Sequence, residues 1–222
     1  MSQISWLEDT DYKFPDVSTA LTEPDGLLIA SELITAELVI TAYTKGIFPW
    51  YSDDQPVLWW SPNPRCVLYP DKFHVSRSLR RTLNNNPFEI KTNTAFKEVM
   101  LACAKPRADG VGTWITERML SVYCELHDRG FAHSIECWQQ DMLVGGMYGL
   151  VLGDMFFGES MFSKKKDASK VAMHYLCTSI KPFLVDAQVY SEHLESLGAE
   201  EIERSDFTDI ILTRLDKHLT IR

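Results

Sequence analysis

The sequence predicts a mixed α/β protein, and two stretches of the chain lead to this prediction. Three apolar runs of strand length, separated by short polar turns as in an antiparallel meander, occupy residues 131–138, 142–150 and 155–162. A helix capped by Asp167 is expected over 168–180, followed by a strand over 183–189 and a helix that begins at Ser191. The order strand, strand, strand, helix, strand, helix in a mixed sheet is that of an N-acetyltransferase-like domain.

Three helices are predicted ahead of the meander. Apolar residues recur at helical spacing from Thr35 to Lys45, and Gly46 ends the pattern. The next two helices are expected at about 94–104 and 116–129, the second of which ends at Gly130. The sequence therefore predicts helices before the three strands of the meander as well as after them.

The segment between the first helix and the rest of the chain is rich in proline and aromatic residues. Pro56, Pro62 and Pro64 argue against regular structure there, while the neighbouring tryptophans and tyrosine need a core or a ligand to pack against. We therefore expect a domain boundary near residues 60–66. The predicted division is a small N-terminal domain over 1–62 and the N-acetyltransferase-like catalytic domain over 63–222.

The composition is that of an ordinary globular protein, with 45% hydrophobic and 24% charged residues. No apolar stretch approaches the ~20 residues of a membrane span, and the first twenty residues do not resemble a secretory signal. Five cysteines without a C-x-x-C pair argue against disulfides and structural zinc, and no histidines are spaced i, i+4 as metal ligands. We expect a cytoplasmic protein without membrane association and without a metal.

Basic residues are concentrated in two parts of a chain whose net charge is −9. One group lies between residues 72 and 91 and the other between 164 and 170. An acidic protein binds a polyanion only through such local patches, although solvated surface is the common alternative. The basic residues that we predict to contact nucleic acid are Arg77, Arg80, Arg81, Lys164 and Lys165.

Two predicted strands carry polar side chains among apolar neighbours. Strand alternation places Glu159 on one face with Met155, Phe157 and Met161. Since an unpaired buried carboxylate is costly, Glu159 requires either a structural partner or a function. Asp186 and Gln188 similarly share a face of the next strand with Leu184, close enough for both to touch one substrate, although an Asp at a strand end also commonly caps a turn.

Glycines interrupt the middle strand of the meander at Gly145, Gly146 and Gly149. Such glycines indicate either a close approach by a ligand or tight packing against neighbouring side chains. No glycine-rich loop of the P-loop or dinucleotide type occurs, so ATP and NAD sites have no support. The string Gly158-Glu-Ser-Met-Phe162 lacks the last glycine of a nucleophile elbow, which argues against a serine hydrolase.

Eight short strings, in collinear order from about Glu23 to Gly198, closely resemble those of the bacterial leucyl/phenylalanyl-tRNA–protein transferases. The strings are Gly46-Ile-Phe-Pro-Trp50, Trp59-Trp-Ser-Pro-Asn-Pro-Arg65, Gly112-Thr-Trp-Ile-Thr116, His133-Ser-Ile-Glu136, Leu143-Val-Gly-Gly-Met-Tyr-Gly149, Gly158-Glu-Ser-Met-Phe-Ser163, Ala168-Ser-Lys170 and Asp186-Ala-Gln188. One departure is Ala30-Ser-Glu-Leu33, in the loop before the first helix, where that family usually has Gly-Gly-Asp-Leu.

The resemblance implies a cytoplasmic enzyme that moves Leu or Phe, and also Met, from aminoacyl-tRNA to the α-amine of proteins beginning with Arg or Lys. Such a transfer marks the acceptor protein for degradation. By the same resemblance Asp186 and Gln188 act on the attacking amine, Glu159 is the active-site acid, and Trp50 and Trp114 bind substrate. We expect a monomer, and the residue-level reasoning leaves open whether Asp186 is a base or an orienting acceptor.

The predicted chemistry needs no cofactor. An aminoacyl ester is already activated, and an α-amine with a pKa near 7.7–8.0 is partly neutral at pH 7. Since Leu and Phe share only apolar bulk, we expect an adaptable pocket for the donor side chain. Its predicted lining is Gly145, Gly146, Met147, Phe156, Met161 and Val171. An acyl-CoA N-acyltransferase and a non-catalytic RNA-binding module are the alternatives, the first weakened by the absence of the glycine pair of a pyrophosphate turn before residue 168.

Overall fold

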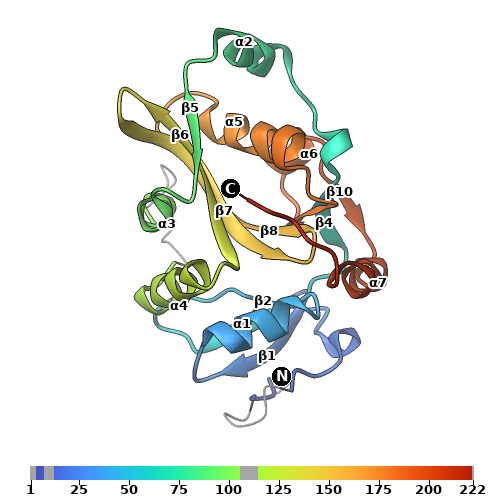
Figure 1. Ribbon diagram of the computed structural model, residues 1–222. Helices are drawn as coiled ribbons and strands as arrows, with labels where there is room; N and C mark the ends of the chain where they lie inside the picture. Colours follow the sequence, from blue (N-terminus) through green and yellow to red (C-terminus); the bar gives the residue numbers. More distant parts are fainter. Residues whose placement is uncertain (1–3, 8–12, 106–114, 222) are drawn as a thin grey trace.

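The computed structural model describes residues 4–7, 13–105 and 115–221, which form two β-sheets with helices around them (Figure 1). The smaller sheet is antiparallel, has the order β1-β3-β2, and lies with helix α1 at one end of the molecule. Its elements are β1 (Leu27–Ser31), α1 (Ala36–Tyr43), β2 (Phe48–Pro49) and β3 (Val57–Trp60). The predicted first helix is confirmed, and the Thr35 side chain accepts from the Leu38 backbone N–H as its N-cap.

Strand β3 lies in the segment of Pro56, Pro62 and Pro64, so the prediction of irregular structure there is wrong for β3. Pro49 lies in β2, at the edge of the sheet, where a missing N–H is tolerated. Pro56 directly precedes β3, and Pro62 and Pro64 follow it, so these prolines delimit the strand instead of interrupting it.

The larger sheet has seven strands in the order β10-β4-β9-β8-β7-β6-β5. The predicted meander is confirmed as three antiparallel strands, and β9 then pairs with β8 in parallel, which makes the sheet mixed. The strands are β4 (Arg65–Leu68), β5 (Glu89–Thr92), β6 (Ala132–Gln139), β7 (Met142–Leu152), β8 (Met155–Ser163), β9 (Val185–Gln188) and β10 (Glu200–Ile202). The observed order β6-β7-β8-α5-β9-α6 is the one predicted for an N-acetyltransferase-like core.

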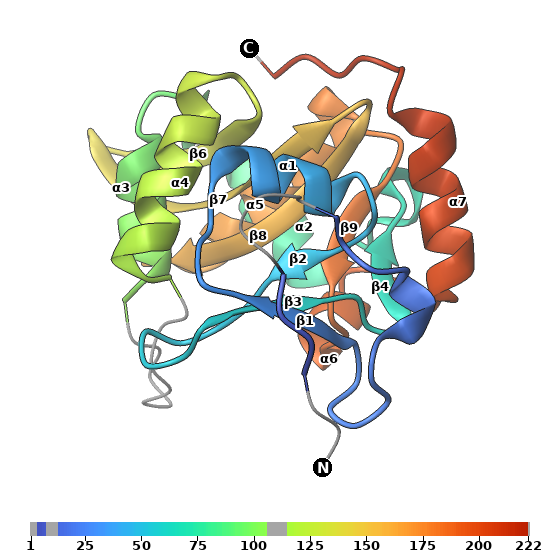
Figure 2. The ribbon, with the colours of Figure 1, turned by 90° about the horizontal axis from the view of Figure 1, so that it is seen from below.

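Helices cover both faces of this sheet. The helices are α2 (Arg77–Asn85), α3 (Phe96–Cys103), α4 (Glu117–Asp128), α5 (Ala168–Tyr175), α6 (Glu192–Glu195) and α7 (Arg204–Arg214), with short 3₁₀ turns at Val17–Thr19 and Pro70–Lys72 and a π-helical turn, Leu176–Ile180, that continues α5. One apolar core joins the sheet to α1, α3, α4 and α7, and a second joins its other face to α2 and α5. The pair α3–α4 and helix α7 flank the molecule on opposite sides (Figure 2).

Asp167 is the N-cap residue of α5, as predicted, but its side chain makes no capping hydrogen bond to the helix. Asp167 has a left-handed backbone, with φ +65°, and its carboxylate accepts from the Thr82 hydroxyl at 2.8 Å. The hydroxyl of Ser163, at the end of β8, instead accepts from the Ser169 backbone N–H at 2.9 Å. The first turn of α5 is therefore satisfied by the strand that precedes it, and Asp167 ties α5 to α2.

A β-bulge in β8 corrects the predicted common face of that strand. Gly158 pairs with Gly149 and Ser160 pairs with Tyr148, so Glu159 is an extra residue with no partner in the register. Phe157 and Glu159 point toward the core of α1 and α4, whereas Met161 packs into the core on the opposite face, against α5. Strict alternation placed Met161 beside Glu159, and the additional residue moves it to the other side.

In the described part of the chain, no helix combines the length and apolarity needed to cross a membrane.

Candidate active site

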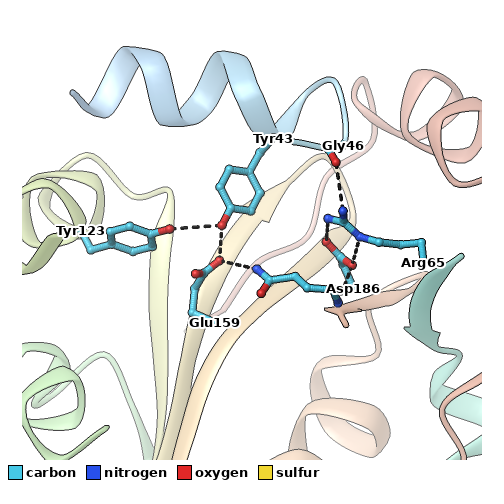
Figure 3. A network of polar contacts seen from close by, with 7 residues as sticks. Tyr43, Gly46, Arg65, Tyr123, Glu159 and Asp186 are labelled. Atoms are coloured by element: carbon cyan, nitrogen blue, oxygen red, sulfur yellow. Dashed lines mark hydrogen bonds and ion pairs between the residues drawn. The ribbon is translucent and has the colours of Figure 1, made fainter. Parts of the chain in front are cut away.

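Glu159 is the centre of a buried polar network between strands β8 and β9 and helices α1 and α4 (Figure 3). The hydroxyl of Tyr43 donates to Glu159 Oε1, and the amide Nε2 of Gln188 donates to the same oxygen at 3.2 Å. The hydroxyls of Tyr43 and Tyr123 lie 3.2 Å apart. The bulge in β8 thus turns a carboxylate toward donors from α1, α4 and β9.

Apolar packing of the rings positions the two tyrosines. Tyr43 is the last residue of α1 and meets the Phe157 ring edge-to-face at 5.3 Å. Tyr123 lies in the middle of α4 and meets Tyr148 in the same manner at 5.9 Å. Each ring is completely buried, so its hydroxyl requires a polar partner inside the protein. Glu159 and the hydroxyl–hydroxyl contact supply these partners.

Burial raises the pKa of Glu159 to about 7, against the hydroxyl groups of Tyr43 and Tyr123, which lower it. The charge of Asp186 also raises this pKa, and that of Arg65 lowers it. Burial and the charge of Glu159 in turn hold the pKa values of Tyr43 and Tyr123 well above their usual range. At neutral pH the network therefore contains one carboxyl group that gains or loses a proton readily and two tyrosines that stay protonated.

A second buried carboxylate, Glu136 on β6, provides a contrast. It accepts from the backbone N–H groups of Thr94 and Ala95 and from three side chains, those of Thr94, Ser134 and Trp138. Burial raises its pKa, but these donors together lower it below the usual value. Every hydrogen bond that Glu136 accepts stabilises its charge, and the carboxylate holds the start of α3. Glu159 accepts fewer hydrogen bonds from the described residues, so its charge is less well stabilised by the protein.

Asp186, on β9, is completely buried and bound by the Arg65 side chain. Arg65 Nε and Nη2 donate to the two carboxylate oxygens of Asp186 at 2.8 and 2.7 Å, and Nη1 donates to the Gly46 carbonyl at 3.0 Å. The guanidinium carbon lies 4.7 Å from the Phe48 ring centre and 4.6 Å from that of Phe207. Both oxygens of Asp186 are occupied, which favours an orienting role over direct proton abstraction.

Gln188 connects this ion pair to Glu159. Its backbone is left-handed, with φ +64°, so the regular alternation of β9 ends there. Its backbone N–H donates to Asp186 Oδ1 at 2.9 Å while its side-chain amide reaches Glu159. The three polar residues selected from the sequence, Glu159, Asp186 and Gln188, are therefore brought into one hydrogen-bonded chain that begins at Arg65.

Sequence reasoning did not select three members of this network: Arg65, Tyr43 and Tyr123. Arg65 directly precedes the apolar run Cys-Val-Leu, and a cation at the start of a buried strand requires a buried anion. Tyr43 stands at a core-facing position of its helix, where a hydroxyl signals a polar partner. Both signals were present in the sequence, but neither identifies the partner.

Most of the predicted donor pocket lies in the core between β7, β8 and α5. Met147 and Phe156 are almost completely buried, Val171 is buried, and Met161 packs against them. A Cβ atom on Gly145 would lie 2.3 Å from the Ala168 Cβ, and one on Gly146 would lie 2.6 Å from the Ile135 carbonyl oxygen. Tight packing therefore accounts for both glycines without a ligand, and a donor pocket at this place stays a prediction.

The two tryptophans predicted to bind substrate are Trp50 and Trp114. Trp50 is 46% exposed, and its ring lies 5.7 Å from that of Trp60, whose indole N–H donates to the Trp50 carbonyl at 2.7 Å. An exposed indole held in this way is available for stacking against a substrate. Trp114 lies outside the described residues.

The two basic groups lie on neighbouring elements. Arg77, Arg80 and Arg81 are exposed on α2, and Lys164 and Lys165 are exposed between β8 and α5. Helix α2 packs against α5, and the Thr82–Asp167 hydrogen bond joins α2 to the residue that follows the lysines. Two groups that are separate in the sequence thus occupy adjoining surface on one side of the molecule (Figure 1).

Within residues 4–7, 13–105 and 115–221, no three His, Cys, Asp or Glu side chains gather as they would around a metal ion. The arrangement instead offers hydrogen-bond acceptors and one carboxyl group of near-neutral pKa. Such a site can bind and orient an amine and influence its protonation.

Comparison with known proteins assigns these residues to a family. The family described as Leucyl/phenylalanyl-tRNA protein transferase matches residues 67–212, and its N-terminal domain matches residues 32–63. The chain is 49% identical over 212 residues to the leucyl/phenylalanyl-tRNA–protein transferase of Cellvibrio japonicus, covering 94% of this chain and 90% of that protein. It is 48% identical over 217 residues to the protein of the same name from Stutzerimonas stutzeri, covering 96% of each. Among solved structures, a GCN5-related N-acetyltransferase from Kribbella flavida aligns with a TM-score of 0.36 and 8% identity, over 73% of this chain and 59% of that one.

Proposed function

Because the chain belongs to the leucyl/phenylalanyl-tRNA protein transferase family, and is thus an aminoacyltransferase acting on aminoacyl-tRNA and proteins, we propose its donors and acceptors as follows. Leucine, phenylalanine or methionine leaves its tRNA and joins the α-amine of a protein that begins with Arg or Lys. The new N-terminal residue marks that protein for degradation. Since aminoacyl-tRNA is made and used in the cytoplasm, we place the reaction there.

The observation that carries this proposal is the incompletely solvated carboxyl group of Glu159. When ionised, it lacks the saturating set of donors that surrounds Glu136, so a cation from a substrate would stabilise it. An acceptor that begins with Arg or Lys brings two cationic groups, its α-ammonium and its side chain. Among the described residues no cationic side chain contacts Glu159, and a buried anion in this situation is suited to such a substrate.

The proposed transfer follows from the chemistry of the donor. The neutral α-amine attacks the ester carbonyl carbon, the C–N bond forms, the ester C–O bond breaks, and the amine proton passes to the departing ribose oxygen. The Nε2 group of Gln188 is engaged by Glu159, which leaves the amide oxygen of Gln188 to accept from the attacking amine. Asp186 acts through Gln188 by fixing its backbone. The ester supplies its own activation, so ATP, CoA and metal are not required.

The remaining site residues are assigned roles on the same basis. Trp50 and Trp114 contact substrate, and a pocket for the donor side chain forms beside Gly145 and Gly146, among Met147, Phe156, Met161 and Val171. The adjoining basic surface of α2 and the segment before α5 contacts tRNA phosphates through Arg77, Arg80, Arg81, Lys164 and Lys165. We also propose a functional division of the chain at residues 62–63. We also propose that the active form is a monomer.

Incubation with purified Leu-tRNA and a peptide that begins with Arg tests the proposed function. We expect leucine to appear on the α-amine of the Arg peptide without ATP, CoA or added metal. A peptide of the same sequence beginning with Ala is the matched control and should not be modified. Transfer from leucyl-CoA but not from Leu-tRNA would support an acyl-CoA enzyme, and tRNA binding without transfer would support a binding module.

A further inference from the structure

Two donors hold Glu159 Oε1, and the backbones of both donor residues are linked to the same arginine by hydrogen bonds (Figure 3). On one side Arg65 Nη1 donates to the Gly46 carbonyl, and Gly46 N–H donates to the carbonyl of Tyr43 at 3.1 Å. On the other side Arg65 binds Asp186, which accepts from the backbone of Gln188. The positions of Tyr43 and Gln188 relative to Glu159 therefore share one anchor.

The environment of Arg65 makes this anchor rigid. The side chain is 1% exposed, its guanidinium lies between the Phe48 and Phe207 rings, and three nitrogens each have an acceptor at 2.7–3.0 Å. A lysine has one nitrogen at the end of a flexible chain and cannot reproduce this fork. Arg65 also joins parts of the chain that are distant in sequence, since Gly46 follows α1 while Asp186 lies in β9 of the large sheet.

Stability alone does not require an ion pair at this place. Replacing a buried ion pair by apolar residues of similar volume is often neutral or stabilising. The fork instead specifies distances and angles, which apolar packing would not do. A functional reason for the geometry is therefore expected.

We propose that Arg65 is a positioning residue for aminoacyl transfer, which holds Gln188 and Tyr43 in the arrangement that Glu159 requires. This inference rests on the proposed function, because it concerns the same transfer reaction. Arg65 itself does not touch the substrates. Its loss should therefore lower turnover while leaving the binding of aminoacyl-tRNA nearly unchanged.

The test compares Arg65→Lys with a matched control, Arg214→Lys. Two nitrogens of Arg214 likewise donate to one carboxylate, that of Asp154, but Arg214 lies on α7 outside the Glu159 network. Thermal unfolding confirms that each variant is folded, and kcat and KM are then measured for transfer from Leu-tRNA to the Arg peptide. For Arg65→Lys we expect kcat to fall about tenfold or more and the KM for Leu-tRNA to stay within about threefold. For Arg214→Lys we expect both values to match those of the wild type.

A second variant covers the case in which Arg65→Lys does not fold. Arg65→Met combined with Asp186→Leu removes both buried charges and should fold. It should show the same loss of kcat with the same KM. Wild-type kcat in either folded variant overturns the proposal, and so does a failure of both to fold while Arg214→Lys folds, because Arg65 would then serve folding alone. If the wild type itself transfers nothing to the Arg peptide, the proposed function fails instead.

Discussion

Replacing Glu159 by Gln should make the protein more stable at alkaline pH. In the folded protein burial raises the pKa of Glu159 to about 7, whereas an exposed Glu has a value of 4.5. Below pH 4.5 both states hold the proton. Between pH 4.5 and 7 only the folded state does, so stability falls as the pH rises through this interval.

The magnitude follows from the size of this shift. At about 1.4 kcal/mol per pKa unit, the wild type loses about 3 kcal/mol between pH 4.5 and pH 8 that Glu159→Gln does not lose. The neighbouring tyrosines Tyr43, Tyr123 and Tyr148 stay protonated across this pH range, because burial raises their pKa values well above 10. Glutamine keeps the shape of a protonated Glu and an oxygen for the Tyr43 hydroxyl.

Urea unfolding followed by tryptophan fluorescence, at intervals from pH 4.5 to 8.5, measures the free energy of unfolding of each variant. The difference between Glu159→Gln and the wild type should grow with pH and reach about 3 kcal/mol. Glu136→Gln is the control: the pKa of Glu136 is lowered, so its charge stabilises the folded state throughout this pH range, and the variant should be less stable than the wild type by an amount that hardly changes with pH. A difference between Glu159→Gln and the wild type that stays constant across this range would refute the reasoning.

Three further predictions concern activity. Arg77→Ala with Arg80→Ala, and Lys164→Ala with Lys165→Ala, should each weaken tRNA binding and reduce the slope of log affinity against log salt by about two; unchanged slopes in a filter-binding titration would remove both pairs from the interface. Asp186→Asn, which keeps one acceptor for the Gln188 N–H, should lower kcat about tenfold in single-turnover assays with tRNA affinity within a few-fold, and wild-type turnover in the folded variant would show that the charge is dispensable. With one Arg peptide as acceptor, the enzyme should transfer Leu, Phe and Met from their tRNAs but not Lys. An apolar pocket discriminates between side chains by about 1–3 kcal/mol per methylene and offers no partner for a charge. Efficient transfer of Lys would contradict such a pocket.

Elements with strong local signals could be predicted from the sequence. Helix α1 has a Thr cap, an apolar face and a terminal Gly, and α4 has the same three features. The meander strands are long and lie next to one another in the sequence, so their pairing needs only short turns. In contrast, β4, β5 and β10 are short strands paired over long separations, and α2 buries only Leu79 of its nine residues, so local patterns did not reveal them.

The candidate site was predictable as a set of residue types but not as an arrangement. A carboxylate among apolar strand residues needs a reason to be there, and this requirement identified Glu159 and Asp186 from the sequence alone. The chain's own strings also identified its family, since collinear short motifs do not depend on tertiary contacts. Fold class, reaction type and the principal polar residues were thus determined by the order of amino acids.

Only the tertiary structure decided how these residues are connected. The bulge that turns Glu159 toward α1 is a property of the β7–β8 register, and the left-handed Gln188 depends on the Asp186 carboxylate beside it. Arg65 meets Asp186 across 121 positions of the chain. Such contacts form only when sheets and helices pack together, because the free energy of pairing a buried charge depends on the groups that surround it in space. Sequence separation carries no information about that distance.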